Sequence, residues 1–156
     1  MNIDILATGS SGNCYLVESS NTKILIECGI PIKQIRNKLK FNIATLDGCL
    51  VTHEHMDHAK SVKDLVKSAI NVYATNGTFK ALNIDNHRAK IIKSNEYFKV
   101  NNLQILPYNT VHDANEPVGY FIKDTNTNDS LMFITDTAYL EYKIPDVNYL
   151  MIECNY

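Results

Sequence analysis

The chain has 156 residues, of which 45% are hydrophobic and 21% charged, and its formal net charge is -2. This composition is typical of a globular protein and excludes the disordered and fibrous classes. The small net charge excludes an overall basic field that would recruit nucleic acid, and leaves open only a local basic patch. The length predicts a single domain over residues 1–156.

No apolar stretch approaches the roughly 20 residues needed to cross a bilayer, and Asp4 stands where a secretion signal would carry lysine or arginine. We therefore expect a cytoplasmic protein with no membrane partner; homo-oligomerisation stays open. The lysine- and asparagine-rich composition fits a low-GC bacterium or its phage. Widely spaced cysteines with apolar neighbours predict buried thiols in a reducing compartment: Cys14, Cys28, Cys49 and Cys154.

The first third of the chain has the alternation of strands. Strands are expected at residues 3–7, 14–18, 23–27 and 48–52. Residues 8–13 have the composition of a tight turn, and the second and third strands form a predicted hairpin. Pro31 is well placed to begin a helix with Ile32, Ile35 and Leu39 on one face.

From Ala59 the apolar period becomes helical. One predicted face holds Val62, Leu65, Val66 and Ala69, and the other holds Lys60, Lys63 and Lys67. Further along, the pattern predicts a short helix at 77–82 and strands at 71–74, 96–100, 103–108, 118–123 and 131–135, with another strand-like segment at 150–156. Strands with inserted helices favour an α+β or layered α/β fold.

Three of the five histidines fall within residues 53–58. Residues two apart in extended backbone project to the same side, so His53 and His55 can converge on one ion. Asp57 and His58 follow where the chain turns, and because adjacent residues there point apart, they can serve a second ion. Imidazole and carboxylate without thiolate suit zinc, manganese or iron in a catalytic site. The alternative, a histidine-rich surface loop, would be an unusual accident at the end of an apolar strand.

The segment T-H-E-H-M-D-H at residues 52–58 resembles the H-x-H-x-D-H signature of the metallo-β-lactamase superfamily. A-T-G-S-S-G-N at 7–13, with I-L-I-E-C-G at 24–29, is similar to the opening of its WalJ/YycJ-like branch. V-H-D-A at 111–114, followed by E-P-V-G-Y, resembles the third motif of that branch, and I-T-D-T at 134–137 resembles the fourth. The resemblance implies a metallo-β-lactamase fold, with αββα layers.

Carried onto this chain, the resemblance implies two divalent ions, with zinc expected first and manganese or iron open. His53, His55 and His112 would hold one ion, and Asp57 and His58 the other, with Asp136 bridging. Taken alone, His112 fits an ordinary loop histidine and Asp136 fits a turn or helix cap. Asp57 would also orient the reactive water and is the expected catalytic residue.

The chain departs from the family pattern in two places. Glu27 stands where the family has a supporting aspartate. The family also supplies a last histidine ligand downstream of the position where this chain ends, so we expect a fold truncated at its C-terminus. The remaining histidine, His87, is expected at the surface.

The resemblance favours a phosphodiesterase or nuclease acting on DNA. Lys60, Lys63 and Lys67 could contact phosphates, although a solvated helix face is the preferred interpretation. The first alternative is a hydrolase of small esters or thioesters, with a pocket lined by Tyr108, Tyr120 or Tyr139. The second is an inactive fragment. An iron redox site is less favoured, because such sites in this fold carry a carboxylate where His55 stands.

Overall fold

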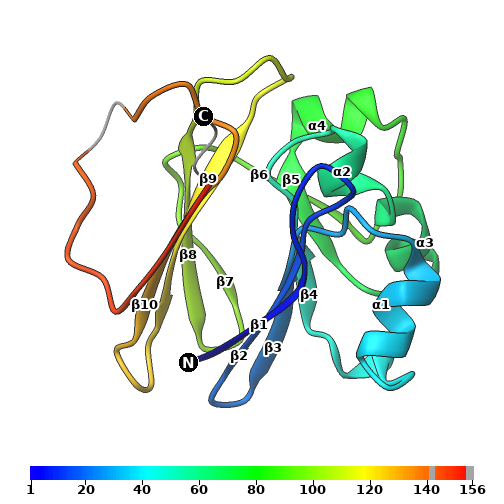
Figure 1. Ribbon diagram of the computed structural model, residues 1–156, viewed down its shortest axis with the longest axis horizontal. Coiled ribbons are helices and arrows are strands. Elements are labelled where there is room, and N and C mark those ends of the chain that lie inside the picture. The colour runs from blue at the N-terminus through cyan, green and yellow to red at the C-terminus, as the bar shows by residue number, and fades with distance from the viewer. Residues whose placement is uncertain (141–142, 154–156) are drawn as a thin grey trace.

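Two β-sheets face each other in the computed structural model, and helices cover the outer face of the first sheet (Figure 1). The structure describes residues 1–140 and 143–153. The first sheet has the strand order β1-β2-β3-β4-β5-β6, antiparallel from β1 to β3 and parallel from β3 to β6. Its strands are β1 (Asn2–Ala7), β2 (Cys14–Ser19), β3 (Thr22–Ile26), β4 (Gly48–Leu50), β5 (Val72–Thr75) and β6 (Ala89–Ile92).

The second sheet has the order β11-β10-β9-β8-β7 and is antiparallel except for the parallel pair β10 and β11. Its strands are β7 (Phe98–Val100), β8 (Leu103–Asn109), β9 (Val118–Asp124), β10 (Ser130–Ile134) and β11 (Tyr149–Ile152). The helices are α1 (Ile32–Lys38), α2 (Met56–Ala59), α3 (Val62–Lys67) and α4 (Asn76–Ala81), with a 3-10 turn at Ile43–Thr45. No helix in the described part of the chain is long and apolar enough to span a membrane.

Alternation along the strands of the first sheet builds two apolar layers. Val17 and Ile24 face the second sheet and pack with Ile105, Tyr120 and other residues of its inner face. Their neighbours in sequence, including Leu16 and Leu25, face the helices. Because side chains alternate between the faces of a strand, both faces of the sheet are buried along its inner strands β2 to β5. The three cysteines within the described residues are free and buried, as predicted: Cys14, Cys28 and Cys49. Cys154 lies outside the described residues.

Within the described residues the structure reproduces the predicted strands with small shifts at their ends, and adds one. The last part of the strand-like segment predicted at 150–156 lies outside the described residues. The edge strand β6 was not predicted, because its A-K-I-I segment lacks regular alternation and Ile91 is 61% exposed. The predicted helix from Ala59 is wrong in its extent. It is divided into α2 and α3 at Ser61, whose hydroxyl donates to Ile30 O and whose N–H donates to Cys28 O. Ala69, predicted on the buried face, is exposed beyond the helix with φ of 63°.

The outer face of the second sheet is covered differently from that of the first. Within residues 1–140 and 143–153 no helix lies on it, so the described part forms three of the four expected layers. Leu140, Ile144 and Val147, from the segment between β10 and β11, pack there against Met132 and Ile134. On this face, the described residues between β10 and β11 therefore cover the sheet in place of a helix.

Asp124 joins the two sheets at one end of the sandwich. Its carboxylate accepts hydrogen bonds from Ser19 and Ser20 beside the β2–β3 turn, and from Asn102 between β7 and β8. Burial opposes its charge, but these bonds and the Asn126 N–H outweigh burial and hold the pKa of Asp124 well below its usual range. One fully buried carboxylate thus ties three turns together.

Replacing Asp124 with alanine is expected to lower the free energy of unfolding by about 2–4 kcal/mol, because it leaves buried donors without an acceptor. Urea unfolding at neutral pH, followed by circular dichroism, measures the difference. The matched control is Asp85→Ala, which removes an exposed carboxylate and should change stability by less than about 0.5 kcal/mol.

The same pair of variants tests the pH dependence. A depressed carboxyl pKa stabilises the folded state above the unfolded value of about 3.9, and this contribution is lost as the pH falls through the folded value. The wild type should therefore lose stability below about pH 4 more steeply than Asp124→Ala. Parallel curves for the two proteins would contradict this role of Asp124.

Candidate metal centre

Strand β4 leads directly into the histidine-rich segment. After Leu50 the chain stays beside β5, with Val51 N–H donating to Tyr73 O, and the Tyr120 hydroxyl donates to Val51 O over 2.7 Å. Thr52 and His53 are both 1% exposed. The chain then turns, and His55 precedes the first residue of α2. The candidate site therefore begins where a buried parallel strand ends, an edge where α/β proteins commonly bind ligands.

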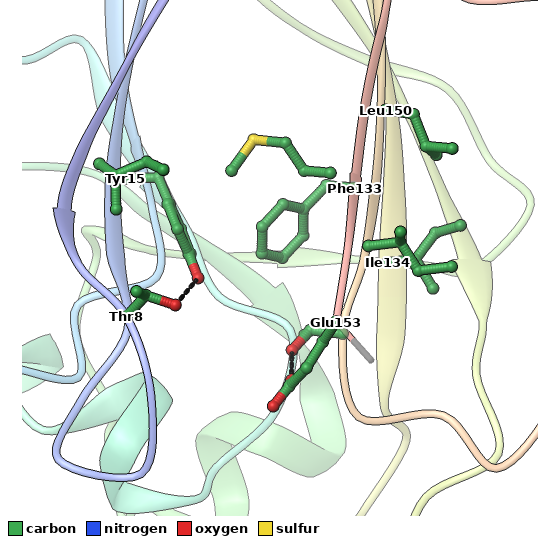
Figure 2. Close-up of a pocket in the computed structure, with 10 residues that line it drawn as sticks. Thr8, Tyr15, Phe133, Ile134, Leu150 and Glu153 are labelled. Atoms are coloured by element: carbon green, nitrogen blue, oxygen red, sulfur yellow. Dashed lines mark hydrogen bonds between the residues drawn. The ribbon is translucent and has the colours of Figure 1, made fainter. Parts of the chain in front are cut away.

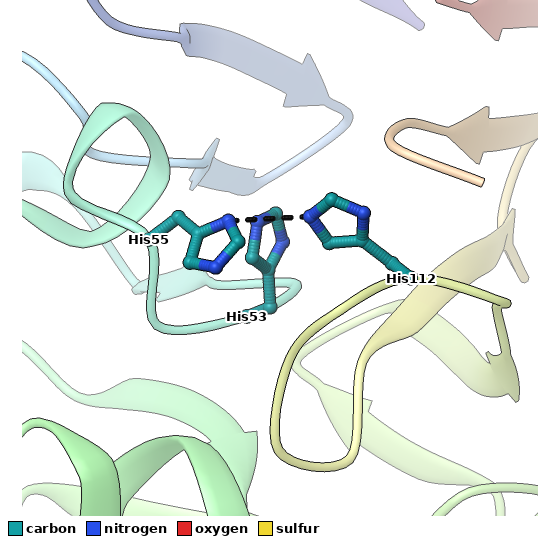
Figure 3. Close-up of side chains that lie close together, drawn as sticks. All are labelled: His53, His55 and His112. Atoms are coloured by element: carbon teal, nitrogen blue, oxygen red, sulfur yellow. Dashed lines mark hydrogen bonds between the residues drawn. The ribbon is translucent and has the colours of Figure 1, made fainter. Parts of the chain in front are cut away.

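Three histidines from two loops form a first group. His53 and His55 come from the segment after β4, and His112 from the loop between β8 and β9; their ligand atoms lie within 4.8 Å of one another. The rings of this group converge (Figure 3), with Nε2 of His112 3.2 Å from Nδ1 of His55. Ring centroids lie 4.6 Å apart for His53 and His55, and 4.7 Å for His53 and His112.

A second group adjoins the first through His53. It consists of His53, His58 and Asp136, the last placed just beyond β10 with φ of 44°. Oδ2 of Asp136 lies 2.8 Å from Nε2 of His58 and 3.6 Å from Nε2 of His53. Asp57 also reaches this group, with Oδ2 3.3 Å from Nε2 of His58. Although Asp57 and His58 are adjacent in sequence, their side chains converge at the start of α2.

The pKa values of the buried rings of His53 and His58 are shifted in opposite directions. Burial, together with His58, His112 and His55, lowers the pKa of His53 to about 3. Burial also opposes charge on His58, but Asp136 and Glu27 outweigh it and raise the pKa of His58 to about 10. The hydrogen bond from His58 in turn lowers the pKa of Asp136 to about 2. The neutral His53 ring and the ionised Asp136 carboxylate therefore offer a lone pair and negative charge to a cation.

An unpartnered buried nitrogen tests whether this donor set fits a metal ion. In the described part of the chain, Nε2 of His53 is buried and has no hydrogen-bond partner, while its Nδ1 lies 2.9 Å from Thr52 Oγ1. With the ring proton on Nδ1, the Nε2 lone pair points into the cluster. Leaving such an atom unsatisfied costs about 1–3 kcal/mol. The imidazole and carboxylate donors therefore fit a zinc-like ion.

The carboxylates of Glu27 and Glu54 hold the segments that carry the candidate ligands in place. Glu27 is fully buried, with Oε1 3.3 Å from Thr52 N and Oε2 3.7 Å from Nδ1 of His58; burial raises its pKa. Glu54 accepts hydrogen bonds from the backbone and side-chain N–H groups of Asn115. The second contact fastens the His53 segment to the loop carrying His112. From the sequence, the position of Glu54 between the candidate ligands His53 and His55 was the one indication that it belongs to the site.

The remaining candidates lie away from the centre. His87 is exposed, as expected from sequence, and so are Lys60, Lys63 and Lys67. The tyrosines named for a small-ester pocket do not share one. Tyr120 is fully buried, the Tyr108 hydroxyl donates to Phe133 O over 2.7 Å, and Tyr139 is 58% exposed.

Comparison with known proteins identifies the family of this chain. The family described as "Beta-lactamase superfamily domain" matches residues 22–156. The chain belongs to the metallo-β-lactamase superfamily. It is also similar in fold to the metallo-β-lactamase fold protein YhfI of Bacillus subtilis, with a TM-score of 0.78 and 14% identity over 99% of this chain and 71% of YhfI. The expected metallo-β-lactamase fold is thereby confirmed.

Two curated relatives belong to the branch identified from sequence. The chain is 31% identical over 156 residues to exodeoxyribonuclease YycJ of Bacillus anthracis, covering 94% of this chain and 58% of YycJ. It is 30% identical over 155 residues to exodeoxyribonuclease WalJ of Streptococcus pneumoniae, covering 92% of this chain and 56% of WalJ. The chain thus spans somewhat more than half the length of these relatives.

Protein purified without chelator is expected to hold about two zinc equivalents per chain, since His55 and His112 lie on one side of His53, and His58, Asp57 and Asp136 offer further donors beside it. Asp136→Ala should reduce this to one or fewer, because the variant removes the carboxylate between the groups. Elemental analysis by plasma mass spectrometry measures the content. His87→Ala, which removes an exposed histidine elsewhere, is the control and should retain the wild-type content; equal losses in both variants would contradict the assignment.

Proposed function

We propose that this chain is a metal-dependent hydrolase that cleaves phosphodiester bonds of DNA. The observation that carries the proposal is the convergence of six side chains with nitrogen or oxygen donor atoms, from loops of both sheets, on one edge of the sandwich. The choice of DNA is supported by the similarity, over more than nine-tenths of the chain, to relatives named exodeoxyribonucleases. Nucleic acid is accordingly the proposed partner and substrate.

Each candidate ligand has a proposed part in this centre. His53, His55 and His112 would hold one ion, and Asp57 and His58 the other, with Asp136 shared between them. Bound ions of this kind acidify a water molecule and stabilise the negative charge that develops on the phosphoryl group. The Asp57 carboxylate, 37% exposed at the mouth of the site, would orient that water by accepting its hydrogen bond.

The shape of the surroundings favours a polymer over a small ester. His55 is exposed, and a cavity of about 560 Å³ lined by His112, Asp113 and Asp136 opens beside the cluster. An open rim admits the end of a long chain, whereas small-ester sites are enclosed and mostly apolar. The tyrosines that would have lined such a pocket are engaged elsewhere or exposed.

We also infer a cytoplasmic location and zinc as the resident metal. Free buried thiols at Cys14, Cys28 and Cys49 are typical of proteins kept in a reducing compartment, where chromosomal DNA is available to a bacterial or phage enzyme. A donor set of imidazole and carboxylate suits zinc, while manganese and iron would use the same side chains.

Asp57→Asn is expected to slow hydrolysis of linear DNA by at least about 100-fold, because the amide orients water poorly and binds metal weakly. Release of nucleotides from end-labelled duplexes, measured against time in zinc-containing buffer, gives the rate. Asp85→Asn, which makes the same change at an exposed carboxylate outside this cavity, is the matched control and should leave the rate unchanged.

A panel of p-nitrophenyl esters and thioesters, tested beside DNA, separates the competing functions. The proposal expects cleavage of DNA, with binding that weakens steeply as salt increases. Cleavage of esters but not DNA would favour the small-ester alternative. A zinc-loaded protein that cleaves neither would favour a chain without turnover and overturn the proposal.

A further inference from the structure

The turn before β2 is fixed directly against the segment that carries Asp57 and His58. Asn13 N–H donates to Asp57 O over 2.7 Å, and Asn13 O accepts from Gly29 N–H over 2.8 Å. The contact is tight because Gly29 has no side chain: a Cβ there would lie 1.6 Å from Asp57 O. Both backbone groups of Asn13 are therefore engaged, and its side chain projects from a fixed point.

The side chain of Asn13 is oriented just as firmly. It is 5% exposed, and its Oδ1 accepts from Gly9 N–H over 3.0 Å and from the Tyr15 hydroxyl over 3.2 Å. Since both partners are placed to donate, they identify the oxygen and direct the amide nitrogen the other way. Nδ2 lies 3.4 Å from Nε2 of His58.

The Tyr15 hydroxyl is itself held on the wall of a second cavity. Thr8 Oγ1 lies 3.2 Å from it, and the two side chains face Phe133, Ile134 and Glu153 across a space of about 340 Å³ (Figure 2). Tyr15 thus reaches Asn13 from this cavity, while Asn13 reaches His58 on its other side. The Asn13 amide is therefore oriented by Gly9 and Tyr15, neither of which is a candidate metal ligand.

The Asn13 amide donor cannot be satisfied by His58. Nε2 of His58 lies 2.8 Å from Oδ2 of Asp136 and 3.3 Å from Oδ2 of Asp57. Nε2 either carries a proton that it donates to Asp136 or gives its lone pair to an ion, and in both states it cannot accept a hydrogen bond from Nδ2. The Nδ2 hydrogen atoms would then have no acceptor among the residues that the structure describes. A buried N–H donor beside a cation is suited to bind an anion there.

We propose that Asn13 is a substrate-binding residue that donates a hydrogen bond from Nδ2 to a phosphoryl oxygen held beside His58. The inference rests on the proposed function for the metal centre and extends it from the metal ligands to the turn at residues 8–13. Where a preorganised donor of this kind stabilises developing charge, its removal lowers kcat by about 10²- to 10³-fold.

The test measures the affinity of the zinc-loaded protein for inorganic phosphate by isothermal titration calorimetry, with zinc content determined for each variant. Asn13→Asp keeps the acceptor for Gly9 and Tyr15 but lacks the N–H donor, and Asn13→Ala lacks both without adding charge. Both should bind phosphate at least about 10-fold more weakly at wild-type zinc content. The control is Asn37→Ala, which changes an exposed asparagine of α1 outside the site and should bind phosphate like the wild type.

Several results would overturn the proposal. The first is wild-type affinity for phosphate in either Asn13 variant. The second is weaker phosphate binding in Asn13→Asp alone, which would indicate charge repulsion. The third is loss of zinc from the variants. If the Asn13 variants do not fold, Tyr15→Phe decides, because it frees one side of the amide and should weaken phosphate binding by about 2- to 5-fold; no change would count against Asn13. A wild-type protein that binds phosphate but cleaves no DNA would refute the proposed nuclease function and leave the role of Asn13 standing.

Discussion

The buried ring of His53 is the constraint on which the candidate centre depends. Its Nε2 lies within reach of both ligand groups and has no hydrogen-bond partner in the described part of the chain. Four imidazoles crowd together there, with the His53 and His58 ring centroids 4.3 Å apart. Such an arrangement is costly when the rings are protonated and favourable when a cation shares their lone pairs. The sandwich supplies the packing free energy that holds them together.

The fold brings the ligands together by closing three loops over one edge of the two sheets. Glu54 fastens the His55 segment to the His112 loop through Asn115, while Asn13 fastens it to the turn before β2. At the opposite end of the sandwich, Asp124 ties the turns of both sheets into one network. The positions of the candidate metal ligands are therefore set by contacts at both ends of the strands, and a change in either network should disturb the candidate centre.

Local patterns were sufficient for most of the strands and indicated the candidate ligands after β4, whereas β6 was missed and His112 and Asp136 were named only through the family resemblance. Alternation predicted β2 and β3, and the H-x-H-x-D-H spacing singled out His53, His55 and His58. The division of the helix at Ser61 was not predictable in this way, because it follows from hydrogen bonds to Cys28 and Ile30. Asn13 was missed as a site residue for the same reason: its partner His58 is 45 positions away.

The most direct test of the central claim is a crystal structure of zinc-loaded protein with diffraction data collected on both sides of the zinc absorption edge. Two anomalous peaks are expected. One should lie among His53, His55 and His112, and the other beside His58 with Asp136 between the two. Zinc found only at His87 or at the cysteines, with no peak at the His53 cluster, would contradict a metal centre at these residues.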